Sequence, residues 1–179
     1  MSELPEGVEL PSAEVAKPRP SAAAVISRNS GQEMEILLCH RVSEVPSFPD
    51  FWAFPGGGIS RVDREAAGNN PSWFSEREDR ESLIALLREM LEEVGVAPDG
   101  SGGFQNVQVE IMDQVNENKS EWAKLVSEGR LSIDNFNPSL ITQRTTPPVA
   151  PIRHRNRFYH VATGDASIEP KLPRGRTEF

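Results

Sequence analysis

One segment of the sequence, residues 79–94, constrains the fold more than any other. Its apolar residues recur at helical spacing and form one face; they are Leu83, Leu86, Leu87, Met90, Leu91 and Val94. Asp79 is a suitable N-cap, and Gly95 can end a helix in the left-handed conformation. The sequence therefore predicts an amphipathic helix here, against which the rest of the chain must supply a core.

Segments typical of strands lie on both sides of this helix. Residues 22–27 and 34–41 are joined by the turn Asn29-Ser30-Gly31 and predict a hairpin. Beyond the helix, we expect strands at residues 106–112, 140–145 and 157–162, a short helix at 119–128 and a polar connector at 131–137. A mixture of this kind predicts a domain of the α/β class.

Length and composition fit one soluble domain. The chain of 179 residues is long enough to bury a core. Residues 1–19 are rich in Pro, Glu and Ala and are expected to form a mobile leader before a domain at 20–179. The net charge of −8 argues against general nucleic-acid binding, and no apolar stretch is long enough to cross a membrane.

The single cysteine indicates the expected compartment. Cys39 has no intramolecular partner for a disulfide and lies in an apolar run, so we expect a buried, inert thiol. The N-terminus lacks the features of a signal peptide. These observations favour a cytoplasmic or other reducing intracellular location.

A glycine-rich loop precedes the predicted helix. Gly56, Gly57 and Gly58 follow Phe54-Pro55, and such a sequence lets the backbone approach a ligand or an ion closely. Residues 60–75 are polar and show no convincing periodicity. We therefore expect an insertion loop, over about residues 60–78, between the glycines and the helix.

Three glutamates lie near the end of the predicted helix. Glu89, Glu92 and Glu93 stand at positions i, i+3 and i+4, so their side chains project from neighbouring positions. Carboxylates this close repel one another, and a hard cation such as Mg²⁺ would relieve the repulsion. Acidic clusters also occur on solvated helix faces without binding metal. The glycine loop, which could lend the Gly56 carbonyl as a ligand, favours metal binding.

The segment Arg88-Glu89-Met90-Leu91-Glu92-Glu93-Val94-Gly95-Val96 resembles the signature of the Nudix hydrolase family. Phe54-Pro55-Gly56-Gly57 resembles its opening. The resemblance implies a Nudix-type α/β/α sandwich with a mixed β-sheet. It also implies that Glu89, Glu92, Glu93 and the Gly56 carbonyl bind Mg²⁺ or Mn²⁺, and that Arg88 positions the loop through an ion pair.

The upstream part of the signature departs from the family. The usual Glu lies eight positions before Arg88, where this chain has Arg80. Glu78, Asp79 and Glu81 are alternative partners for Arg88, and the sequence does not choose among them. The interval between the glycines and the helix is also unusually long.

This long interval resembles the coenzyme A diphosphatase-like branch of the family. Residues 125–131, the run Thr145-Thr146-Pro147-Pro148 and residues 155–159 are similar to later features of that branch, whereas Pro46 and Asp50 depart from its upstream pattern. By the same resemblance, a further strand and helix would follow residues 171–179, so the domain is expected to be truncated at its C-terminus. Many related enzymes form homodimers.

Basic residues in this acidic chain are candidates for binding substrate phosphates. Arg41 stands at the end of a predicted strand, where a surface ion pair is the alternative role. Arg153, His154, Arg155 and Arg157 form a basic cluster, and alternation along a strand puts its arginines on one face. We expect at least one of these arginines to face substrate, with Arg155 and Arg157 as the candidates; the alternative is that the cluster lies beside the acidic surface of the chain. The three histidines show no metal-ligand spacing.

The predicted activity is Mg²⁺-dependent hydrolysis of a diphosphate bond in a nucleoside diphosphate linked to another moiety. Coenzyme A or acyl-coenzyme A is the favoured substrate. The alternatives are a nucleotide-sugar or dinucleotide pyrophosphatase, and a Nudix-like module that senses a nucleotide without cleaving it. Glu93 or Glu92 is expected to act as general base, and Glu178 is a further candidate.

Overall fold

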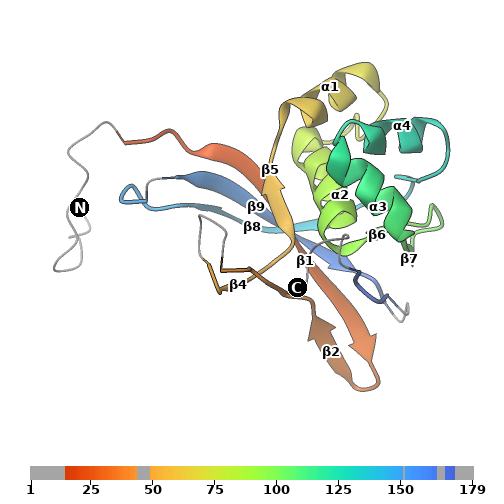
Figure 1. The fold of residues 1–179 in the computed structure, drawn as a ribbon, viewed down its shortest axis with the longest axis horizontal. Helices are drawn as coiled ribbons and strands as arrows, with labels where there is room; N and C mark the ends of the chain where they lie inside the picture. Colours follow the sequence, from red (N-terminus) through yellow and green to blue (C-terminus); the bar gives the residue numbers. More distant parts are fainter. Residues whose placement is uncertain (1–14, 44–48, 151, 165–167, 172–179) are drawn as a thin grey trace.

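The computed structural model describes residues 15–43, 49–150, 152–164 and 168–171. A five-stranded sheet forms its base, with the order β2-β1-β9-β8 and with β5 paired to β1. Strands β1 and β9 run parallel, while the other pairs are antiparallel, so the sheet is mixed. Four helices gather at one end of this sheet (Figure 1). The α/β class and the mixed sheet are confirmed.

The central strand of the sheet is β1, Arg19–Ser30. Alternate residues Ala22, Ala24 and Ile26 are buried, and the small side chains of the two alanines allow helix α2 to pack closely on the sheet. The predicted hairpin is confirmed: β1 pairs with β2, Glu33–Ile36. The expected strand 34–41 is interrupted, however, because its continuation, β3 (Cys39–His40), leaves the main sheet and pairs with β4 (Trp52–Ala53).

Helix α2, Arg80–Val94, lies where residues 79–94 predict it and is almost entirely buried. Gly95 ends it in the left-handed conformation, as expected. Asp79 occupies the N-cap position but makes no side-chain cap bond. Its carboxylate instead accepts hydrogen bonds from Tyr159 Oη at 2.9 Å and from the Arg77 guanidinium at 2.9 Å. Asp79 thus ties the start of the helix to strand β9.

The expected insertion loop at 60–78 is wrong in part, because it contains helix α1, Arg61–Asn69. Its first turn is fixed by Asp63, whose carboxylate accepts hydrogen bonds from the Ser60 backbone N–H and hydroxyl, each at 2.7 Å. Only Asp63, Ala66 and Ala67 of the helix are buried. A helix with so few apolar contacts leaves almost no periodic signal in the sequence.

The strand expected at 106–112 is also wrong. The chain forms a short strand β7, Phe104–Asn106, paired with β6, Val96–Pro98, and then enters helix α3, Val109–Glu117. Met112 and Val115 of this helix are fully buried. Alternation within a few apolar residues does not distinguish a strand from one turn of a buried helix.

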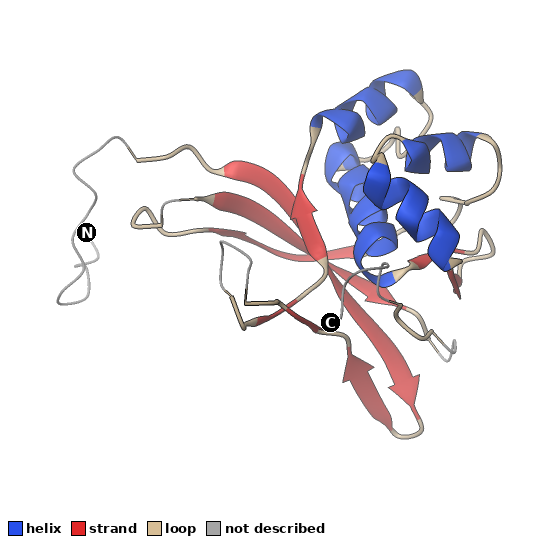
Figure 2. Ribbon diagram, in the orientation of Figure 1, coloured by secondary structure: helices blue, strands red, loops and turns tan. Residues whose placement is uncertain are grey.

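The remaining elements follow the expectations more closely. Helix α4, Glu121–Ser127, falls within the expected helix, and residues 131–137 form a connector. Strands β8, Ser139–Thr145, and β9, His154–Ala162, complete the sheet. Helix α2 packs on the sheet at its central strand, β1, which lies beside β9. The core therefore lies between this helix and the two strands (Figure 2). Most of the expected leader, residues 1–14, lies outside the described residues, and β1 begins at Arg19.

None of the described helices has the length and apolar character that a membrane crossing needs.

Candidate active site

The acidic end of α2 packs against the glycine strand β5, Gly56–Gly58. Strand β5 is held by antiparallel pairing with residues 21–23 of β1. The Gly56 backbone N–H donates to Glu93 Oε2 at 2.8 Å. A side chain at position 57 would collide with the Glu89 carboxylate. Because these positions are glycines, the carboxylates of Glu93 and Glu89 lie directly against the backbone of the loop.

Arg88 lies beneath these glutamates and is completely buried. Its guanidinium donates to Glu92 Oε2 at 3.0 Å, pairs with Glu89 Oε1 at 2.8 Å and donates to the Gly58 carbonyl at 3.2 Å. Arg88 thus binds α2, two glutamates and the glycine strand together. The positioning role that the family resemblance implies for Arg88 stays a prediction.

The partner of Arg88 that the sequence left open is Asp63, on α1. Nε donates to Asp63 Oδ1 at 2.7 Å and Nη2 donates to Asp63 Oδ2 at 3.0 Å, which makes a bidentate, fully buried pair. Burial lowers the pKa of Arg88, but the bond to Asp63 and the nearby carboxylates raise it by more. None of the three expected candidates, Glu78, Asp79 and Glu81, is paired with Arg88.

The usual spacing of eight positions before Arg88 does not reach Asp63. Counted forwards, Asp63 follows the glycines closely, and Ser60-Arg61-Val62-Asp63 has the pattern of a helix start. The additional residues therefore lie between Asp63 and Arg88, not before Asp63. Arg80, which stands at the usual Glu position, has a different role: it donates to the carbonyls of Ala67, Asn70 and Trp73 and so fastens the inserted segment to α2.

Two of the three glutamates are buried, and removing their charges from water is unfavourable. Glu89 is 7% exposed and Glu92 is 4% exposed. Burial raises the pKa of Glu89 above its ordinary value and the charge on Glu92 adds to this, while Arg88 and Lys119 act in the opposite direction. A cation bound beside Glu89 and Glu92 would be stabilised by their negative charges.

One observation supports a metal ion in particular. Glu92 Oε1 is buried and has no hydrogen-bond partner among the described residues, although such a group normally has one. In the described part of the chain, no group of three or more His, Cys, Asp or Glu side chains is arranged to hold a metal ion. The open Glu92 Oε1 therefore fits a hard cation that takes a few carboxylate oxygens and fills its remaining positions with water or phosphate oxygens.

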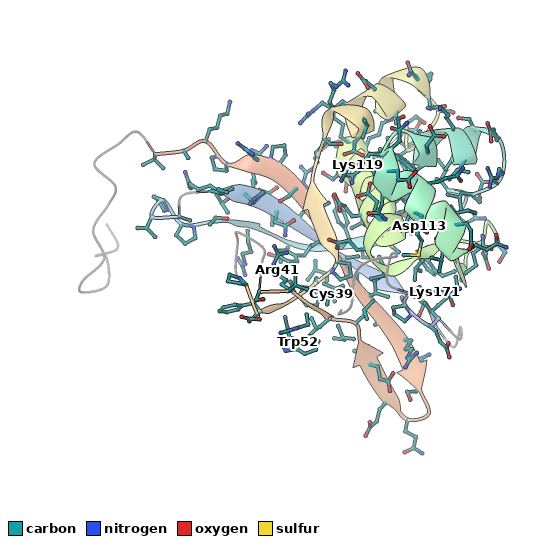
Figure 3. The ribbon with its side chains drawn as sticks, viewed as in Figure 1. Cys39, Arg41, Trp52, Asp113, Lys119 and Lys171 are labelled. Atoms are coloured by element: carbon teal, nitrogen blue, oxygen red, sulfur yellow. The ribbon has the colours of Figure 1, made fainter. Side chains whose placement is uncertain are left out.

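The β3–β4 ribbon borders the site and bears two of the predicted residues (Figure 3). Cys39 is half-buried; burial raises the pKa of its thiol to about 12, and the charge of Glu93 contributes. The sequence predicted a buried, inert thiol, and the burial is only partial. Arg41 extends the ribbon through backbone hydrogen bonds with Asp50 and Phe51, at 3.0 and 2.9 Å. The exposed Trp52 ring packs on His40, with centroids 4.9 Å apart.

The structure does not bring Arg155 and Arg157 beside the glutamates. Arg157 donates to Ser82 Oγ at 3.1 Å, in the first turn of α2. Ten helical residues separate Ser82 from Glu92, which corresponds to ~15 Å along the axis. Both arginines line a separate cavity of about 380 Å³, together with Glu78, Ser82 and Gln143. Glu178 lies outside the described residues.

Lys119 is a site residue that sequence reasoning missed. It lies between α3 and α4, and its Nζ donates to Glu92 Oε2 at 2.9 Å. An isolated lysine in a polar segment gives no signal of its own. Only the packing of α3 against α2 brings it to the glutamates.

Comparison with known proteins identifies the family of the chain. The family described as "NUDIX domain" matches residues 17–126. The structure is similar to a crystal structure of a NUDIX hydrolase from Alicyclobacillus acidocaldarius. The TM-score is 0.70 at 28% sequence identity, over 89% of this chain and 75% of that one.

Two further solved structures are more distant. A MutT/nudix family protein from Enterococcus faecalis has a TM-score of 0.47 at 18% identity, over 96% of this chain and 45% of that one. An Ap4A hydrolase from C. elegans has a TM-score of 0.44 at 12% identity, over 86% and 72%. Comparison with curated proteins gave no significant match.

Proposed function

Because the chain belongs to the Nudix family of hydrolases, which act on phosphorus-containing anhydrides, we propose that Glu89, Glu92 and Glu93 bind the divalent metal that supports hydrolysis. The unpartnered, buried Oε1 of Glu92 carries this proposal. Mg²⁺ is the preferred ion and Mn²⁺ is an alternative, since both take oxygen ligands. A carbonyl of the glycine strand, that of Gly56, is the proposed backbone ligand.

Bound metal would neutralise charge on the diphosphate oxygens and acidify a coordinated water. The chain's own residues prepare this chemistry. Arg88 and Asp63 hold the end of α2 in register with the glycine strand, and the Gly56 N–H orients the Glu93 carboxylate. Glu93 is more exposed than Glu89 and Glu92, so we propose Glu93 as the general base that accepts a proton from water.

The proposed substrate is a nucleoside diphosphate linked to another moiety, with coenzyme A or acyl-coenzyme A favoured. The similarity of residues 125–131, 145–148 and 155–159 to the coenzyme A diphosphatase-like branch supports this choice. Arg41, on the ribbon beside the site, is the proposed phosphate contact. Arg155 and Arg157 are proposed contacts for the far end of an elongated substrate, because their cavity lies at the other end of α2.

A hydrolysis screen tests this proposal. Coenzyme A, acyl-coenzyme A, nucleotide sugars, dinucleotides and nucleoside triphosphates are incubated with the protein and Mg²⁺, and products are identified by mass. We expect coenzyme A to yield two phosphate-bearing products, and kcat to fall about a hundredfold or more in Glu93→Gln, the scale of losing a general base. Glu65→Gln, an exposed glutamate on α1, is the matched control.

Preferred cleavage of a nucleotide sugar or a dinucleotide would reject coenzyme A while leaving the metal site intact. Equal activity of wild type and Glu93→Gln would reject Glu93 as the base. Binding of nucleotides without any hydrolysis would reject catalysis by this chain under the conditions used.

A further inference from the structure

Lys119 places an ammonium group on the acidic cluster from outside α2. Its Nζ lies 2.9 Å from Glu92 Oε2, the same oxygen that accepts from Arg88. The Lys119 side chain is 50% exposed, whereas the Glu92 side chain is 5% exposed. The half-exposed side chain of Lys119 therefore ends in an ammonium group that contacts a buried carboxylate. Figure 3 shows Lys119 among the helices, apart from Arg41 and Cys39 on the ribbon.

The segment that bears Lys119 is fixed to α2 at the same residue. Asn116 Nδ2 donates to the Glu92 backbone carbonyl at 3.1 Å and to the Met112 carbonyl at 2.9 Å. Helix α3 is anchored by the buried Met112 and Val115. The end of α3 thus holds Glu92 by its backbone, while Lys119 holds it by its side chain. This double attachment distinguishes Lys119 from an ordinary surface lysine, whose ion pairs contribute little.

The charge of the cluster gives Lys119 a specific consequence. Arg88 and Asp63 offset each other in their buried pair. The three glutamates are then three negative charges in one place, and Lys119 offsets one of them. A divalent cation that binds the open Oε1 of Glu92 would lie a few Å from the ammonium on Oε2. Two cations this close repel each other strongly in a poorly solvated site.

We propose that Lys119 competes with the divalent metal for Glu92 and thereby sets the metal affinity of the site. The inference rests on the proposed function, in which Glu92 is a metal ligand. Lys119 acts through Glu92 and is a positioning residue. It keeps the cluster partly neutralised without metal, and it weakens metal binding.

Direct metal binding tests the proposal without measuring activity. Free Mn²⁺ is titrated by electron paramagnetic resonance in wild type, Lys119→Met and Lys119→Arg. We expect Lys119→Met to bind Mn²⁺ about tenfold more tightly, the effect of removing roughly 1.4 kcal/mol of repulsion. Lys119→Arg keeps the charge and should stay near wild type. Lys124→Met, an exposed lysine paired with Glu121 on α4, is the matched control and should not change.

The outcomes separate this inference from the proposed function. Unchanged Mn²⁺ affinity in Lys119→Met overturns the competition, and weaker affinity overturns it in favour of a lysine that orients Glu92. In either case, loss of Mn²⁺ binding in Glu92→Gln would leave the proposed metal site standing. If Glu92→Gln binds Mn²⁺ as tightly as wild type, the assignment of Glu92 as a ligand fails as well. Lys119→Gln is titrated in parallel, so that a folding defect confined to the methionine variant does not decide the result.

Discussion

At the scale of single residues, the molecule depends on the buried pair of Arg88 and Asp63. Both side chains are fully enclosed, and each satisfies several hydrogen-bonding atoms of the other. A buried ion pair contributes little net stability compared with a well-packed apolar pair, but removing one partner leaves an uncompensated charge. The pair is therefore a sensitive point of the structure.

We expect Asp63→Ala to lower the free energy of unfolding by about 3–5 kcal/mol, because Arg88 would lose its principal partner in the core. The first turn of α1 would also lose the bonds from Ser60. Glu65→Ala, on the exposed side of the same helix, should cost no more than about 0.5 kcal/mol. Urea denaturation measures both. A loss below about 1 kcal/mol for Asp63→Ala would contradict this role of the pair.

Individual residues of the site differ in how far the sequence revealed them. Glu89, Glu92, Glu93 and Arg88 lie within one helix, where spacing along the chain determines spacing in space. Asp63 and Lys119 reach the site from other elements, and their positions depend on how α1 and α3 pack on α2. Tertiary contacts of this kind are not encoded in local spacing. The roles of the glutamates as metal ligands remain predictions.

At the scale of elements, the close contact between β5 and α2 shapes the site. Strand β5 consists only of glycine, and the positions along it are not equivalent. An added Cβ at Gly57 would meet the Glu89 carboxylate, while one at Gly58 would meet nothing within 4 Å. The strand therefore needs glycine at position 57 for a reason that does not apply at position 58.

We expect Gly57→Ala to push the Glu89 carboxylate aside and to lower kcat about tenfold or more, at a cost of about 1–3 kcal/mol in stability. Glu89 is a flexible side chain, so the fold should survive. Gly58→Ala is the matched control and should have nearly wild-type activity. Steady-state kinetics combined with thermal unfolding distinguish the two effects. Equal damage by both substitutions would show that backbone freedom, and not contact with Glu89, is what the strand requires.

The success of sequence reasoning also varied among the elements. Helix α2 and strands β1, β8 and β9 were predicted because each has enough apolar residues to show its period. Helix α1 was missed because Asp63, Ala66 and Ala67 are its only buried residues, and one of them is charged. Helix α3 was wrongly predicted as a strand because its apolar residues are too few to establish a period. Both errors arise from short elements whose form is decided by what they pack against.

At the scale of the whole molecule, the acidic cluster links stability to pH. Glu89 has an ordinary pKa of 4.5, and burial, followed by the charge of Glu92, raises it in the folded state. Below 4.5 the carboxyl is protonated in both states. As the pH rises from 4.5 towards the raised folded pKa, the unfolded chain releases this proton while the folded chain still holds it, so folding loses free energy.

We therefore expect metal-free wild type to lose stability relative to Glu89→Gln as the pH rises from about 4.5 to 8. The measurement is the difference in the free energy of unfolding between the two proteins, from urea titrations in the presence of a chelator. The same titrations on Glu65→Gln, an exposed glutamate, serve as the control. A difference that stays constant, or that moves in favour of wild type with rising pH, would contradict a raised pKa of Glu89 in the folded protein.

The inserted segment between Asp63 and Arg88 also has an evolutionary consequence. The bond between these residues is defined in space, and Arg80 fastens the intervening chain to α2 by backbone carbonyls alone. The Arg80 bonds themselves constrain no side chain of the segment, while Trp73 and Phe74 pack on Trp122 and Phe136. The length of the segment and its other side chains can therefore vary between related proteins while the ion pair persists. Homologues of this chain are better recognised by searches that allow a variable gap between the two halves of the signature than by patterns of fixed spacing.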